Sequence, residues 1–258
     1  MKREKRLIPW LILAGFALSG TVIAIPLQRT EIPTITQEIP DSGQVWLDDR
    51  ACTALGGIEA IRAVKTITSK VVLVQTTPMG DMVMDGELVV VYPDRFRASL
   101  TTPYGSIQMI LTGEDAWMVV TDRGEAALPE YQKKMMLEAQ FRDAVVLFTS
   151  REAYAVRYKG RRTFFGTNVV DLEVKRGDYI FHMLLNPQTG LPEGYSYTES
   201  GPQGPQDKEE RSSEYQTING YAVPMKSEVF SAGKKESETR ITECRVNVPY
   251  EESWFQKP

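Results

Sequence analysis

The one histidine of this 258-residue chain, His182, is the side chain best suited by type to acid–base chemistry near neutral pH. It stands between Phe181 and Met183, so on a strand it would face the side opposite these apolar neighbours. The sequence places no serine or cysteine nucleophile beside it. One histidine and two distant cysteines also cannot supply the usual ligand spacing of a zinc site. We therefore predict no catalytic residue and no metal site.

Adjacent carboxylates are the second candidates for chemistry, and they occur for example at positions 48–49, 209–210 and 251–252. Side chains that are neighbours in sequence diverge on a helix or strand, which is poor geometry for a general acid and a general base acting on one substrate. We interpret these pairs as solvated charges, and the polar stretch 206–213 as a solvated loop or sheet edge. The chain also lacks a phosphate-binding glycine loop, a nucleophile elbow and a calcium loop. These observations predict that the protein is not an enzyme.

The two cysteines, Cys52 and Cys244, could form a single intramolecular disulfide if the protein lies in an oxidising compartment. The alternative is a pair of buried free thiols that pack as small apolar side chains, since Cys244 shares strand parity with Val246 and Val248. Neither cysteine has a neighbouring histidine that would indicate a nucleophile. Both alternatives stay open at this point.

The N-terminus indicates the compartment. Four basic residues among the first six positions precede residues 7–25, which carry no charge, and this pattern is typical of an export signal. As a helix, a segment of this length spans about 28 Å, close to the hydrocarbon thickness of a bilayer. Residues 1–25 are therefore expected to be either a cleaved signal peptide or a retained anchor in the inner membrane. In both cases the rest of the chain would be periplasmic or otherwise extracytoplasmic.

Charge and composition divide the remainder of the chain. With 30 basic and 34 acidic residues the net charge is -4, so no positive excess favours a phosphate backbone, and we predict no nucleic-acid partner. Residues 26–42 contain three prolines among polar residues and are expected to form an extended linker. Residues 43–258 show no repeat and no break in composition, which predicts a single domain.

Strands are the elements that must position these residues. A helical pattern that begins near Ser42 is interrupted at Gly56 and Gly57. From Thr66 onward the apolar residues recur mostly with a period of two, and turn signals such as Asn219-Gly220 separate the runs. Short connections favour an antiparallel meander of about ten or eleven strands, and a sheet of that size should curl. The predicted fold class is mainly β with helices (α+β), a curled sheet or half-barrel.

One segment, Pro129 to Thr149, interrupts the strand pattern. It contains no glycine and no further proline and is rich in helix formers, so we expect a helix that closes the curled sheet. Leu137, Phe141, Val145 and Phe148 would lie on one stripe of that helix. Methionines are frequent on both the helix and the strands and can repack around guests of different shape. The pattern fits either a binding cavity or a plain core with flexible side chains.

Five strings in chain order carry a resemblance to a known family. They are residues 54–61 before the first strand, 88–97 around a proline, 111–117 ending in a tryptophan, 218–224 around an Asn-Gly turn, and 246–255 at the end. In this order they resemble exported proteins grouped with the LolA/LolB-like carriers, which sort outer-membrane lipoproteins. The resemblance extends over residues 45–256.

The resemblance implies a half-barrel closed by helices, whose apolar interior holds the acyl chains of a lipid or lipoprotein and needs no cofactor. Each buried methylene contributes about 0.8 kcal/mol, so part of one acyl chain suffices for a complex that can later dissociate. The candidate cavity residues are Met82, Met84, Leu88, Phe96, Leu100, Met109 and Trp117 on the sheet and Leu137, Phe141, Val145 and Phe148 on the helix.

The chain departs from the best-known carriers at one position. Those carriers have an arginine immediately before the proline of the second string, where it helps to latch the lid, and this chain has Tyr92. Two functions are therefore expected as alternatives. The first is a lipid or lipoprotein carrier, and the second is a membrane-anchored regulatory or interaction domain of the same fold that binds an envelope protein.

Overall fold

A continuous sheet of thirteen antiparallel strands forms the body of the protein in the computed structural model, which describes residues 42–121, 124–201 and 204–257. The strands are β1 (Thr66–Thr77), β2 (Gly80–Val91), β3 (Arg95–Thr102), β4 (Gly105–Thr112), β5 (Asp115–Val120), β6 (Gly124–Ala127), β7 (Ala155–Phe164), β8 (Thr167–Arg176), β9 (Tyr179–Leu185), β10 (Pro192–Gly201), β11 (Gly204–Ile218), β12 (Tyr221–Ser231) and β13 (Lys234–Val246). Their order in the sheet is β6-β5-β4-β3-β2-β1-β13-β12-β11-β10-β9-β8-β7. Two meanders are thus joined where the first strand pairs with the last.

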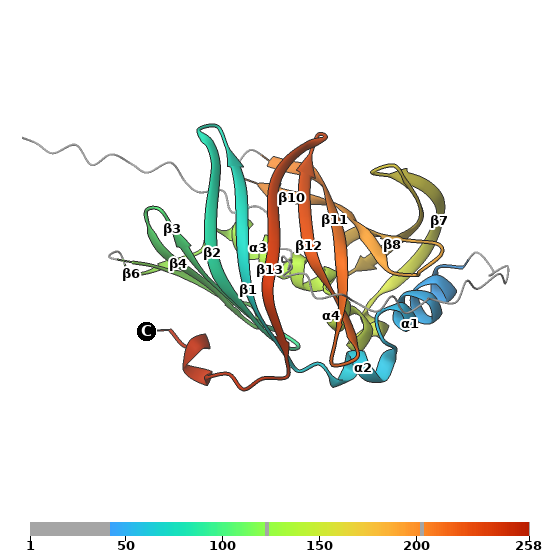
Figure 1. The fold of residues 1–258 in the computed structure, drawn as a ribbon, viewed down its shortest axis with the longest axis horizontal. Coiled ribbons are helices and arrows are strands. Elements are labelled where there is room, and N and C mark those ends of the chain that lie inside the picture. Colours follow the sequence, from blue (N-terminus) through green and yellow to red (C-terminus); the bar gives the residue numbers. More distant parts are fainter. Residues whose placement is uncertain (1–41, 122–123, 202–203, 258) are drawn as a thin grey trace, which may run out of the picture.

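The sheet curls into a half-barrel and does not close, because β6 and β7 remain its two edges (Figure 1). The predicted fold class is confirmed. The described strands outnumber the ten or eleven expected for two reasons. β6 is a four-residue strand without alternation, and the polar stretch 206–213, expected to be a loop or an edge, lies inside β11 between two other strands.

Short helices open the domain, and a glycine pair separates them as predicted. A π-helical segment η1 (Val45–Ala51) continues into α1 (Cys52–Ala54), and α2 (Ile58–Ala63) follows the glycines. Ser42 caps the first turn, since its Oγ accepts a hydrogen bond from the Val45 amide at 3.1 Å. Gly56 has φ +113°, and a Cβ there would lie 1.9 Å from the carbonyl oxygen of Gly220. Only glycine fits this close approach to the β11–β12 turn.

The predicted single helix over 129–149 is two helices, α3 (Glu130–Arg142) and α4 (Ala144–Thr149), followed by the 3-10 turn η2 (Arg151–Ala153). Asp143 causes the break. Its backbone is extended (ψ 130°), and its carboxylate accepts hydrogen bonds from the amides of Val145 (2.8 Å) and Val146 (3.2 Å). An aspartate that caps a helix in this way ends the preceding one. Both helices lie across the hollow of the sheet (Figure 1).

Apolar side chains form layers on both faces of the sheet. The larger core fills the concave side beneath the helices. A second cluster on the convex face consists of Val89, Val91, Ile110, Trp117 and Phe255, the last from the terminal 3-10 helix η3 (Glu252–Phe255). Trp117 pairs with Ile110, whereas the next residue along β5 pairs with the concave-facing Met109. The prediction that Trp117 lines the hollow is therefore wrong by one residue of strand parity.

Cys52 and Cys244 are both free, so the disulfide alternative is not realised. Cys52 is buried on α1, and Cys244 is half-buried on β13. Burial raises the pKa of both thiols, which makes them poor nucleophiles.

None of the helices in the described ranges is long and apolar enough to cross a membrane. The predicted signal or anchor, residues 1–25, and nearly all of the predicted linker, residues 26–42, lie outside the described residues.

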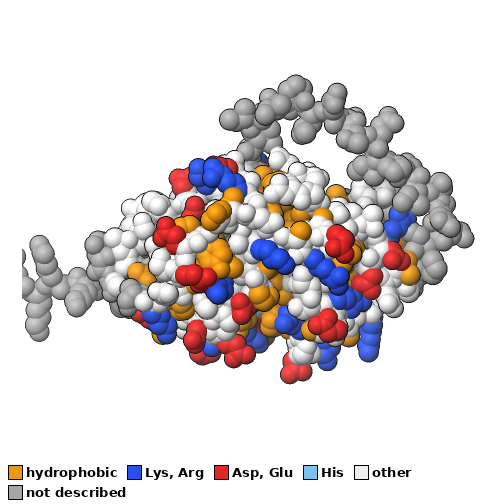
Figure 2. Space-filling view, turned by 90° about the horizontal axis from the view of Figure 1, so that it is seen from below, with side chains coloured by type: hydrophobic (Ala, Val, Ile, Leu, Met, Phe, Trp, Pro, Cys, Tyr) orange, Lys and Arg blue, Asp and Glu red, His pale blue; other side chains and the backbone are white. Residues whose placement is uncertain are grey.

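Surface charge is mixed on the face that Figure 2 presents. Basic and acidic side chains alternate there around small apolar areas, and this face shows no continuous basic stripe among the described residues. A stripe of that kind would be needed to follow a phosphate backbone.

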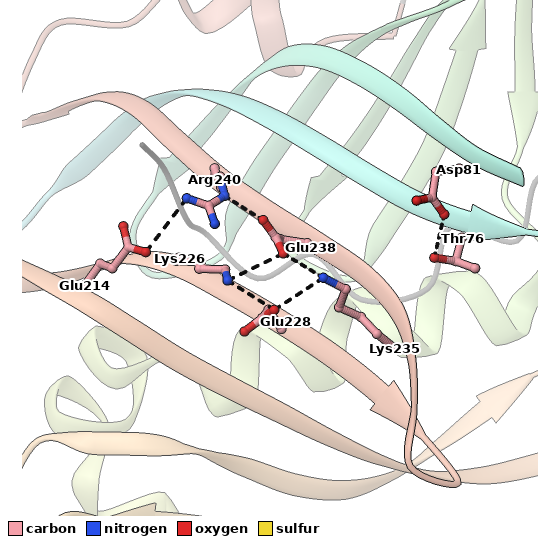
Figure 3. A network of polar contacts seen from close by, with 8 residues as sticks. All are labelled: Thr76, Asp81, Glu214, Lys226, Glu228, Lys235, Glu238 and Arg240. Carbon is pink, nitrogen blue, oxygen red and sulfur yellow. Dashed lines mark hydrogen bonds and ion pairs between the residues drawn. The ribbon is translucent and has the colours of Figure 1, made fainter. Parts of the chain in front are cut away.

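An ion-pair network covers the outer side of β12 and β13 (Figure 3). Glu238 is at its centre, with its carboxylate 2.5 Å from Arg240, 2.8 Å from Lys235 and 3.5 Å from Lys226. Burial alone would raise the pKa of Glu238, but hydrogen bonds from Lys235 and Arg240 and the charge of Lys226 lower the pKa to about 2. The charged carboxylate therefore stabilises the folded state.

Replacing this carboxylate gives a pH-dependent stability change. The Glu238→Gln variant should lose roughly 1–3 kcal/mol of unfolding free energy at pH 7, where the native carboxylate is fully charged. The contribution is present above the unfolded pKa of 4.5 and is lost as the pH falls towards about 2, so the two proteins should converge there. Urea unfolding between pH 7 and 2 measures this, with exposed Glu125→Gln on β6 as the control. A constant difference across that range would contradict the assignment.

Candidate apolar binding cavity

An apolar cavity of about 100 Å³ lies between the concave side of β2–β4 and the α3 helix. Alternation on β2 places Leu88, Val90 and Tyr92 on the same face, and helical spacing on α3 brings Met135, Met136 and Ala139 towards them. The full lining consists of Leu88, Val90, Tyr92, Arg95, Phe96, Met109, Gln132, Met135, Met136, Ala139, Gln140, Arg142, Asp143, Val146 and Glu199. The wall is mostly aliphatic and aromatic, with polar side chains among its lining residues.

The sheet residues predicted for the cavity are only partly in place. Leu88, Phe96 and Met109 line it. Met84 and Leu100 are buried in the concave core away from the opening, and Met82 is half-buried against the same core. The alternation along each strand therefore predicts which face of β2, β3 and β4 is concave-facing. It does not predict which positions on that face line the cavity and which are covered by other side chains.

The predicted helical stripe does not face the cavity. Phe141 packs instead against the Arg176 guanidinium (4.2 Å) and Tyr179, and Leu137 is half-buried outside the lining. Val145 and Phe148 are buried in the concave core on α4. The predicted stripe requires one continuous helix. The break at Asp143 changes the direction of the chain, so the two halves of the stripe do not share a face.

The junction of α3 and α4 is attached to the β2–β3 turn by two hydrogen bonds. The Tyr92 hydroxyl donates to Asp143 Oδ2 at 2.9 Å, and Gln140 Nε2 donates to the carbonyl of Pro93 at 2.8 Å. Burial raises the pKa of Asp143, although the bonds from Tyr92 and two backbone amides oppose this. Tyr92 thus contacts the covering helix from the position where the LolA-like carriers have arginine. The sequence shows that tyrosine stands at this position, but only the structure shows that its hydroxyl bonds to Asp143.

A second cavity of about 120 Å³ adjoins the first, and Tyr92, Ala139, Arg142 and Asp143 line both. Its lining surface is mostly apolar but carries a larger polar share than the first, and we call it the polar cavity. Its other walls come from the concave side of β10–β12 and include the carboxylate of Glu210. The remaining lining residues are Leu55, Ile67, Ala144, Pro192, Tyr195, Ser212, Tyr215, Tyr221, Val223, Pro224 and Ser227.

Arg142 is the basic residue that lines both cavities, and only 6% of it is exposed. Its guanidinium carbon lies 3.5 Å from the centroid of the Tyr197 ring, and it donates a hydrogen bond to the Tyr179 hydroxyl. Stacking on tyrosine is the packing that a planar guanidinium favours.

Two buried carboxylates accompany this arginine, Glu199 on β10 and Glu210 on β11. Burial raises the pKa of both. Of the adjacent acids at 209–210, only the second points inwards, because neighbours on a strand face opposite sides. The interpretation of Glu210 as a solvated charge is wrong, since its strand is covered on the concave side.

His182 lies outside both cavities, on the side opposite Phe181 and Met183 as predicted. Its Nδ1 lies 2.6 Å from Asp171 Oδ1, and Arg162 Nε lies 3.0 Å from the other oxygen of that carboxylate. Arg162 also donates to the Ser196 hydroxyl at 2.8 Å. The described residues contain no cluster of His, Cys, Asp and Glu that could hold a metal ion.

Solved structures share this architecture. A domain assigned to outer-membrane lipoprotein sorting from Vibrio parahaemolyticus is 14% identical (TM-score 0.53), and the match covers 79% of this chain and 97% of that domain. A LolA superfamily protein from Nitrosomonas europaea is 13% identical (TM-score 0.56), with coverage of 81% and 98%. A DUF1329 family protein from Desulfovibrio piger is 10% identical (TM-score 0.57), with coverage of 81% and 97%.

The chain has the LolA-like fold. No family model matches the sequence, and no curated protein matches it at a significant level. The resemblance that the five strings carried is confirmed at the level of the fold. At identities of 10–14% the ligand has to be inferred from the residues of this chain.

Removing the Tyr92 hydroxyl tests the attachment of the helices. We expect Tyr92→Phe to lower the unfolding free energy by about 1.5–3 kcal/mol, because a buried carboxylate oxygen loses its donor. Amide hydrogen exchange in α3 and α4 should become faster. Urea unfolding measures the first effect and hydrogen-exchange mass spectrometry the second. Tyr104→Phe, at an exposed turn, is the matched control. Unchanged exchange in both helices would show that the bond does not hold them.

Proposed function

We propose that the protein is an exported carrier that binds an acyl chain of a lipid or lipoprotein in the apolar cavity beneath α3. One observation supports this above the others: five unbranched or branched aliphatic side chains face an unfilled space from opposite walls. They are Leu88, Val90, Met109, Met135 and Met136. The aliphatic part of this lining can hold an alkyl chain through apolar contacts, while the charged residues Arg142 and Glu199 also line the cavity.

The covering helix gives the cavity a means to enlarge. About 100 Å³ accommodates only part of an acyl chain, so a longer segment requires α3 to move away from β2 and β3. The two hydrogen bonds at Tyr92 and Gln140 fix one end of α3, and flexible methionines face the sheet. Movement about that attached end would widen the apolar side first.

The expected affinity is that of a carrier which releases its ligand. Six to ten buried methylenes contribute about 5–8 kcal/mol, which corresponds to dissociation constants between about 1 mM and 1 μM. The protein would work on the outer side of the inner membrane, as the export pattern of residues 1–25 predicts. Intact-mass measurement of protein isolated from the envelope would show whether it begins at residue 1 or close to residue 25.

Filling the cavity should abolish binding. In Ala139→Trp the indole would occupy the space between the two walls, and we expect at least a tenfold weaker affinity for a fluorescent fatty acid, equivalent to about two lost methylenes. Ala155→Trp, at an exposed position of edge strand β7, adds the same ring away from the cavity and should bind normally. Titration by fluorescence measures both. Equal affinities would contradict the proposed site.

A second variant separates binding from stability. Trp117→Ala removes a side chain from the convex cluster and should cost about 3–5 kcal/mol of unfolding free energy. Because Trp117 lies on the other face of the sheet, fatty-acid affinity under folding conditions should stay within twofold of the native value. Loss of binding in a folded Trp117→Ala protein would place the ligand on the convex side.

A further inference from the structure

The charges around the polar cavity are arranged in an unusual way for a protein interior. Buried ions are normally in direct contact with an opposite charge, because desolvation is costly. Lys208 follows this rule, since its buried ammonium lies 2.5 Å from Glu236. Arg142, Glu199 and Glu210 do not, although each is less than a tenth exposed, and among the described residues none of the three forms an ion pair.

These three groups have unused hydrogen-bonding capacity. Arg142 donates one hydrogen bond, to Tyr179, and Glu210 accepts one, from Ser227 at 3.2 Å. The buried hydroxyl of Tyr197, whose ring lies under the guanidinium, has no partner. By contrast, Asp143 is saturated by Tyr92 and two backbone amides. The polar cavity therefore presents one cation, Arg142, and one anion, Glu210, that are not ion-paired, while Glu199 lines the adjoining apolar cavity.

We infer that the polar cavity receives the headgroup of a zwitterionic phospholipid, with its phosphate at Arg142 and its ammonium at Glu210, while an acyl chain of the same molecule occupies the apolar cavity. The inference rests on the proposed function and specifies its ligand. Continuity supports it, because Tyr92, Ala139, Arg142 and Asp143 line both cavities.

Charge complementarity selects the zwitterion over a simple anion. An anionic head alone would pair with Arg142 but would also be repelled by Glu199 and Glu210. Both carboxylates interact electrostatically with this arginine and are therefore close to it. A head with both signs pairs with the guanidinium and a carboxylate together, and so offsets part of the desolvation cost of both. An uncharged head would supply an ion-pair partner to none of the three groups.

The test compares lipids that share their acyl chains and differ only in the head. Native mass spectrometry of the full chain, with diacylglycerol, phosphatidylglycerol and phosphatidylethanolamine, measures relative affinities. We expect phosphatidylethanolamine to bind at least about tenfold more tightly than each of the other two. Soluble glycerophosphoethanolamine is added as a competitor and should not displace the lipid at equal concentration. Displacement by it would assign the cavity to a soluble zwitterion and overturn the lipid assignment.

Two variants assign the charges. Glu210→Gln should reduce the preference for phosphatidylethanolamine over phosphatidylglycerol to within threefold and leave diacylglycerol binding unchanged. Arg142→Gln should weaken both phospholipids relative to diacylglycerol. If Arg142→Gln does not fold, Glu210→Gln decides alone. Glu209→Gln, on the outer face of the same strand, is the matched control and should behave as the native protein.

The outcomes separate the two proposals. Equal binding of all three lipids would overturn the headgroup assignment and leave acyl-chain binding intact, with water as the occupant of the polar cavity. An unchanged lipid preference in folded Glu210→Gln would overturn it too. Failure of every lipid, diacylglycerol included, would overturn the proposed function and the headgroup assignment together.

Discussion

The apolar hollow of the curled sheet is the constraint on which the rest of the structure depends. Thirteen strands joined through β1 and β13 form a concave surface that must be removed from water, and the sheet does not close on itself. Among the described elements, α3, α4 and the N-terminal helices contribute side chains that cover it. The convex apolar patch is covered separately by η3, so the two faces are independent in packing.

The helical cover is interrupted at Asp143, and this junction determines how both helices are placed on the sheet. Asp143 ends α3, caps α4 and accepts the Tyr92 hydroxyl, so one carboxylate sets the direction of both helices and attaches them to the β2–β3 turn. Arg142, the residue before it, is thereby held between the two cavities. The apolar and polar spaces are consequences of the same junction.

The residue before the proline of the β2–β3 turn differs in chemistry between this chain and the carriers that it resembles. The carriers that the second string resembles have arginine before the strand proline, and this chain uses the neutral Tyr92 to reach a carboxylate on the helix. A neutral donor avoids placing another positive charge beside Arg142. It also leaves the guanidinium of Arg142 as the cation that both cavities share. Fold similarity thus describes the scaffold, while the ligand depends on the side chains inside it.

The sequence alone determined a curled antiparallel sheet with a helical insertion and a break between the N-terminal helices at Gly56-Gly57. Alternation and turn residues were sufficient because these signals depend on local backbone geometry. Which face became concave was decided only by the tertiary structure. A period of two shows that Trp117 and its neighbours face opposite sides, but the sign of the curl determines which side is the hollow. Likewise, Glu210 reads as a surface charge until strands and helices distant in sequence cover it. Burial depends on packing between elements that are distant in sequence, so it cannot be predicted from the sequence of a single strand.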